Sequence, residues 1–197
     1  MKSLFTLALL LTLTTTITRA QSWHYGLKAG LTLSNIDGNG MSSKVKPGFQ
    51  IGGFAERTFN SKWSIQPELM FSQSVVTRND EFLKYYNTEG RSGTKDKVSL
   101  WYVAVPVLVR YNITPVISVL AGPQYGILVG TNEEFLRGDR NAFKRSEFSA
   151  NIGAQVNLNA VSFYARYNKG LNNVNDIDDR YKWTSNQVQV GIAVKIK

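Results

Sequence analysis

Few residues of this sequence could carry out chemistry. There is no cysteine, which excludes thiol chemistry and disulfides. The single histidine is His24, and histidine-based acid–base or nucleophilic sites need acidic or hydroxyl partners within hydrogen-bond reach. Asp176, Asp178 and Asp179 could attract calcium, but the twelve-residue pattern of a calcium-binding loop does not follow them. We therefore expect no catalytic residue, no metal site and no cofactor.

Six charged residues stand out because each lies within a segment in which apolar and polar residues alternate. All six fall on the polar positions of that alternation. A buried charge must be paired and hydrogen-bonded to be tolerated. We expect the six to form a structural network, helped by Tyr164, Gln66 and backbone carbonyls: Lys28, Glu56, Glu68, Arg110, Arg166 and Lys195.

The segments that position these residues have the pattern of long β-strands. Period-two alternation is sustained, whereas helical periodicity is hard to find. Most of the strands have 11 to 14 residues, against about 5–6 for a globular strand and about 9–11 for a tilted strand that crosses a bilayer. Eight strands are predicted: Trp23–Ile36, Phe49–Phe59, Trp63–Val76, Ser99–Tyr111, Val116–Val129, Phe148–Leu158, Val161–Leu171 and Gln187–Lys197.

The connections alternate in length. Three are tight turns, at Asn60-Ser61, Asn112 to Pro115 and Asn159-Ala160. Between them lie polar, charged segments that we interpret as solvated outer loops: Asp37–Gly48, Thr77–Val98, Gly130–Glu147 and Asn172–Asn186. This plan predicts an all-β, eight-stranded antiparallel up-and-down transmembrane β-barrel with short periplasmic turns and four longer outer loops, formed by residues 21–197 as one domain.

Alternation alone does not say which face points inward, because a lipocalin-like barrel hides its apolar face and a membrane barrel shows it to lipid. The glycines favour a polar interior, since glycine suits a narrow lumen where backbones approach closely. Seven of them share the polar parity: Gly26, Gly30, Gly52, Gly122, Gly126, Gly153 and Gly191. Aromatic residues bracket the apolar face like a membrane-interface girdle: Trp23, Phe59, Trp63 and Tyr111.

A polar interior places the six charges in the lumen at two levels. Lys28, Glu68 and Arg166 are expected at one level, and the other three nearer the periplasmic end. Arg57 has the lipid-facing parity and is expected to snorkel to the interface. Proline forfeits a ladder hydrogen bond, so we expect either a bulge or a strand boundary other than the predicted one near each of Pro67, Pro106 and Pro123.

The first twenty residues are typical of a secretory signal peptide. Lys2 provides the positive charge, an apolar stretch runs from Leu4 to Ile17, and a small residue, Ala20, ends the segment. Residues 1–20 are therefore expected to be removed and the protein to reach the outer membrane of a Gram-negative-type bacterium. Its expected partners are outer-membrane lipid, the barrel-insertion machinery and an envelope protein bound through the long loops. The formal charge of +9 is spread over mixed-sign segments, so no nucleic-acid partner is expected.

Several segments resemble the PorT-like outer-membrane β-barrel family, in order along the chain. They are Gly26 to Leu31, Trp63-Ser64-Ile65-Gln66-Pro67-Glu68-Leu69, Val105-Pro106-Val107-Leu108-Val109-Arg110-Tyr111, Ala121-Gly122-Pro123 and Ala165 to Leu171. The resemblance implies an integral outer-membrane protein, and some members of the family are linked to protein secretion. The chain departs from the family at Ala104, where a carboxylate is common, and at its non-aromatic end, Lys195-Ile196-Lys197.

Three functions remain open from the sequence. The chain is either a non-enzymatic structural or interaction protein of the cell envelope, a soluble periplasmic barrel that binds an apolar ligand, or a membrane enzyme with a site at the outer rim. The first is favoured, because eight strands leave a lumen just wide enough for side chains and His24 lies at the periplasmic end, away from that rim.

Overall fold

A computed structural model describes residues 23–38, 45–77, 97–131, 144–176 and 181–196. These residues form eight strands: β1 (Trp23–Asp37), β2 (Lys46–Thr58), β3 (Trp63–Thr77), β4 (Lys97–Asn112), β5 (Ile117–Thr131), β6 (Ser146–Leu158), β7 (Val161–Gly170) and β8 (Thr184–Lys195). No helix of the described chain is long and apolar enough to cross a bilayer. The proposed signal peptide, residues 1–20, lies outside the described residues.

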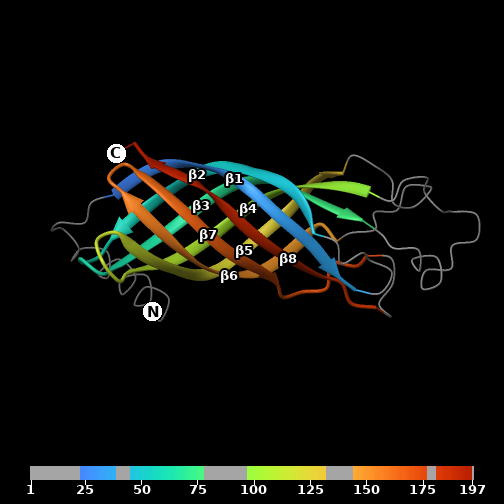
Figure 1. The fold of residues 1–197 in the computed structure, drawn as a ribbon. Helices are drawn as coiled ribbons and strands as arrows, with labels where there is room; N and C mark the ends of the chain where they lie inside the picture. Colours follow the sequence, from blue (N-terminus) through green and yellow to red (C-terminus); the bar gives the residue numbers. More distant parts are fainter. Residues whose placement is uncertain (1–22, 39–44, 78–96, 132–143, 177–180, 197) are drawn as a thin grey trace, which may run out of the picture.

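The strands close into an antiparallel barrel in which each strand pairs with the next and β8 pairs with β1 (Figure 1). A row of paired residues, followed once around the barrel from Trp23, returns to β1 ten residues further along. With a rise of about 3.3 Å per residue and about 4.8 Å between strands, this offset tilts the strands by about 40°. The row is Trp23, Arg57, Ile65, Val109, Ala121, Ile152, Tyr167, Val188 and Leu33.

The apolar face of the barrel points outward, as the glycine parity predicted. On β6, Ile152 is 64% exposed while its neighbour Asn151 is 4% exposed. The same alternation of buried polar and exposed apolar positions runs along β7 and most of β8. The lipocalin-like alternative required the reverse arrangement and is therefore wrong.

Aromatic side chains gather near both ends of the outward face. At the short-turn end, Trp63 and Tyr111 have ring centroids 4.7 Å apart. Nearer the long-loop end, Trp101 contacts both Phe49 and Phe71, with centroids 5.6 and 5.3 Å away. Only the first group was predicted from the sequence, because the second lies several residues inside the strand ends.

The prolines cause no bulge and lie inside β3, β4 and β5, so both alternatives expected for them were wrong. Next to Pro67, Pro106 and Pro123 the ladder is interrupted for two residue pairs and then resumes in the same register. The one register shift among the described strand pairs lies between Trp101 and Tyr102, near the long-loop end. Because the interruptions lie side by side on β3, β4 and β5, the barrel tolerates the missing donors without changing register.

Candidate functional site: the barrel lumen

The middle of the lumen holds Glu68 between two cations. Lys28 Nζ lies 2.5 Å from Glu68 Oε1, and Arg166 Nη1 lies 2.8 Å from Oε2. Arg166 also donates from Nε to Gln189, and the Lys28 ammonium lies 4.8 Å from the centre of the Tyr164 ring. All three charged side chains are nearly inaccessible to solvent.

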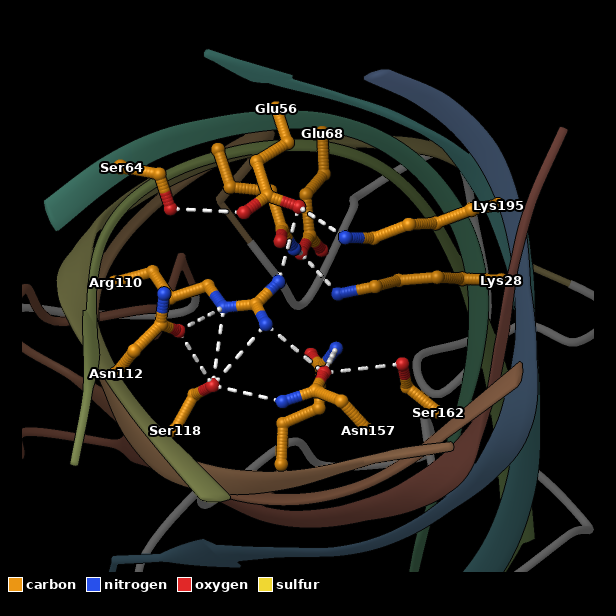
Figure 2. A network of polar contacts seen from close by, with 12 residues as sticks. Lys28, Glu56, Ser64, Glu68, Arg110, Asn112, Ser118, Asn157, Ser162 and Lys195 are labelled. Atoms are coloured by element: carbon orange, nitrogen blue, oxygen red, sulfur yellow. Dashed lines mark hydrogen bonds and ion pairs between the residues drawn. The ribbon is translucent and has the colours of Figure 1, made fainter. Parts of the chain in front are cut away.

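Nearer the short-turn end, Glu56 bridges Arg110 and Lys195. Its Oε2 lies 3.0 Å from Arg110 Nη1 and 3.2 Å from Lys195 Nζ, and Ser64 donates to its Oε1 (Figure 2). The Arg110 guanidinium spreads its remaining donors over three further side chains that point into the lumen: Asn112, Ser118 and Asn157 (Figure 2).

The structure therefore brings all six predicted residues together, as two groups at the two expected levels. Each group has two cations and one carboxylate. Tyr164 faces the cations as expected, but Gln66 donates to Glu68 and so competes with them for the carboxylate. The sequence did not identify the amide and hydroxyl side chains on β3, β4, β5, β6 and β8 that bind these charges. Most of these contacts depend on the register between strands.

The lumen glycines leave room for these side chains. A Cβ built on Gly191 would lie 2.6 Å from the Tyr164 hydroxyl oxygen, and one on Gly30 would lie 2.9 Å from it. Tyr164 therefore crosses the lumen over a surface made by two facing glycines, which are paired across β1 and β8.

Adjacent glycines on β2 give a matched test of this crowding. A Cβ on Gly52 would lie 2.6 Å from the Met70 sulfur and would meet backbone of β3, whereas a Cβ on the next residue, Gly53, meets nothing nearer than 3.5 Å. We expect Gly52→Ala to lower the free energy of unfolding by about 1–3 kcal/mol and Gly53→Ala to change it by less than about 0.5 kcal/mol. Urea titration of the refolded variants measures both, and equal effects would contradict the assignment of Gly52 to a crowded lumen.

Towards the long-loop end the lumen lining consists mainly of amide and hydroxyl groups and then becomes partly apolar. Asn168 donates to Ser149 and Asn151, and Asn151 donates to Gln124. Five apolar side chains are buried beyond this amide layer: Ile36, Val75, Leu100, Val174 and Trp183. Backbone hydrogen bonds tie Val174 to Trp183 and to Lys144. The predicted loop Asn172–Asn186 is therefore partly folded over this end, and its buried residues are a departure from the solvated loop that we expected.

Glu147 is a buried carboxyl at this end, and it corrects the prediction that it belongs to a solvated loop. The residue is 6% exposed because β6 begins at Ser146, two residues earlier than predicted. Ser185 donates a hydrogen bond to the carboxyl, yet Oε1 has no hydrogen-bond partner. None of the residues that the structure describes forms a salt bridge to it.

Removing the charge of Glu147 is expected to stabilise the barrel. A buried carboxylate without a counter-ion costs more than a neutral amide of the same shape at the same site. Glu147→Gln should therefore raise the free energy of unfolding by about 1–3 kcal/mol at mildly alkaline pH. Asp176→Asn, at an exposed residue, serves as the control. A destabilised Glu147→Gln variant would show that the carboxylate has a counter-ion.

The described residues offer no metal centre, since no three histidine or acidic side chains gather among them. His24 lies at the short-turn end, opposite Glu56 in the register, and its Nδ1 has no hydrogen-bond partner. Asp178 and Asp179 lie outside the described residues. The arrangement of the lumen can hold eight strands together through ion pairs and hydrogen bonds.

Residues 19–176 match the model of one protein family, described as outer membrane protein beta-barrel domain. This chain belongs to that family. Its fold is similar to Ail, the attachment invasion locus protein of Yersinia pestis, in a complex with the heparin analogue sucrose octasulfate, with 14% identity and a TM-score of 0.53 over 89% of this chain and 99% of that one. Neisserial surface protein A is similar at 12% identity and a TM-score of 0.51, over 90% of this chain and all of that one. There is no significant match among curated protein sequences.

Both neighbours are outer-membrane barrels of the same closed, eight-stranded plan. At identities of 14% and 12%, these two structures support the fold of this chain, which is a member of the outer membrane protein beta-barrel domain family. In bacterial outer-membrane barrels the short turns lie at the periplasmic side and the long loops lie outside.

Proposed function

We propose that this family member is a non-enzymatic, integral outer-membrane protein with a structural or interaction role in the cell envelope. The observation that carries the proposal is the lumen. All six charged side chains at its middle and periplasmic levels take part in ion pairs. Charges held in this way stabilise the barrel and are not free to transfer protons to a substrate.

The filled lumen also argues against a diffusion pore. The gap beside Lys28 and Arg166 has a volume of about 10 Å³, which is room for about one water molecule. Arg110 on β4 reaches across the periplasmic end to partners on β2, β5 and β6 (Figure 2). Contact with other molecules is therefore left to the outward face and to the two ends of the barrel.

The finer assignment to the PorT-like group is part of the proposal and rests on the ordered motifs of the sequence. Membership of the PorT-like group implies that the protein takes part in secretion through an envelope partner, which its outer segments bind. Crosslinking in intact cells followed by affinity purification tests this role. Recovery of secretion components supports it, and recovery of insertion machinery alone would contradict it.

The outer-membrane role as a whole is tested by separating the cell envelope and running the outer-membrane fraction on a denaturing gel with and without boiling. We expect the protein to require detergent for extraction and to migrate differently before heating, because a closed ladder resists unfolding. Recovery as a soluble periplasmic protein would contradict the proposal.

A further inference from the structure

The outward face of the barrel carries very few charges. We consider the outward-facing strand residues whose side chains are described and that lie between the two aromatic groups. They include one cation near each end of the barrel, Arg57 on β2 and Lys169 on β7. A charge at the midplane of the lipid-facing surface is costly, but near the interface it costs about 0–1 kcal/mol. The level of each cation along the barrel axis therefore decides what it contacts.

The pairing register gives those levels. The offset is ten residues over eight strands, so a move along a row of paired residues to the next strand changes the level along the barrel axis by about 3 Å. A move of two residues along one strand changes that level by about 5 Å. On this scale Lys169 lies within about 2 Å of the level of Phe49 and Phe148, at the outer edge of the apolar face. Arg57 lies about 20 Å below it, so the two cations lie near opposite edges of a band that is about 25 Å tall in such barrels.

The surroundings of Lys169 leave its ammonium free to contact lipid. Its neighbours in the row are Ala150 on β6 and Asn186 on β8. The Tyr167 hydroxyl, one step deeper on the same face, donates to Asn186 over 2.9 Å. The side chain of Lys169 is exposed and forms no salt bridge to any described residue. A lysine stem can lie along the apolar face while its ammonium reaches the headgroup level.

We propose that Lys169 binds the phosphate of an outer-leaflet lipid and so holds that lipid against β6, β7 and β8. The chemistry that it recognises is an anionic phosphate whose acyl chains lie on the apolar face directly below. The outward positions beside it in the row, Ala150 and Asn186, are uncharged. Asn186 donates to the Asp37 carboxylate over 2.6 Å, and that carboxylate forms no salt bridge with the lysine, so the ammonium is available to a phosphate. This inference rests on the proposed outer-membrane placement.

The test uses the full chain, refolded into mixed vesicles of phosphatidylcholine and phosphatidic acid, with bound lipids counted by native mass spectrometry. A lysine near an anionic surface contributes about 1 kcal/mol, so Lys169→Met should reduce the ratio of bound phosphatidic acid to phosphatidylcholine about fivefold. Lys169→Arg should keep the ratio, and so should Lys182→Met, which removes an exposed cation from the segment beyond the strands.

An unchanged ratio in Lys169→Met would overturn the proposal, as would an equal loss in Lys182→Met. If inorganic phosphate bound to the wild type in detergent as well as phosphatidic acid does, the site would be one for free phosphate instead of lipid. The heat-dependent gel shift of each variant is measured on the same samples. A protein that lacks this shift and does not insert contradicts the outer-membrane role itself, so the two failures are distinguishable.

Discussion

Glu68→Gln is expected to lower the free energy of unfolding by about 3–5 kcal/mol. The substitution keeps the shape of the side chain but removes the carboxylate that Lys28 and Arg166 share. Both cations would then remain buried without a counter-ion, because the carboxylate at the neighbouring lumen level, Glu56, is bonded to Arg110 and Lys195. Urea titration in lipid vesicles, followed by tryptophan fluorescence, measures the change.

The control for this variant is Asp176→Asn, which removes a negative charge from an exposed residue outside the strands. We expect it to change the free energy of unfolding by less than about 0.5 kcal/mol. If Glu68→Gln were no more destabilising than this control, the mid-lumen ion pairs would not hold the barrel together.

Ile152→Lys is expected to destabilise the barrel by about 2–4 kcal/mol in a bilayer. Ile152 is 64% exposed and lies near the middle of the outward face, where lipid cannot solvate an ammonium. The matched control is Ile113→Lys, since Ile113 is 58% exposed but lies in the turn between β4 and β5. The same urea titration compares the two. Equal effects at both positions would show that the outward face of β6 does not meet lipid.

Strand identity and face were predictable from the sequence because both follow from local periodicity. All eight predicted strands are present, with ends that differ by up to three residues. The parity of residues such as Gly30 and Gly191 identified the inner face, because a narrow lumen needs small residues wherever a large side chain such as Tyr164 crosses it.

The features that the sequence did not reveal depend on contacts between distant strands. The two levels of the charge network could be counted from the turns, but the partners of Arg110 and Arg166 on other strands could not be named without the register. The burial of Glu147 and Trp183 was missed because both lie in polar segments whose local pattern is typical of a loop. The unchanged register on both sides of the prolines was not predicted, because the strand propensity of proline describes a single strand and not a closed ladder.

The central claim is that the polar face lines the lumen and the apolar face meets lipid, and a single-cysteine scan along β6 tests it most directly. The absence of native cysteine makes every label unique. Each residue from Phe148 to Val156 is replaced in turn, labelled with a fluorophore and reconstituted with brominated lipids that quench from the hydrocarbon region. The account predicts period-two quenching, strong at Phe148, Ala150, Ile152, Ala154 and Val156 and weak at the residues between them. Quenching with the opposite phase, or none at either parity, would contradict it.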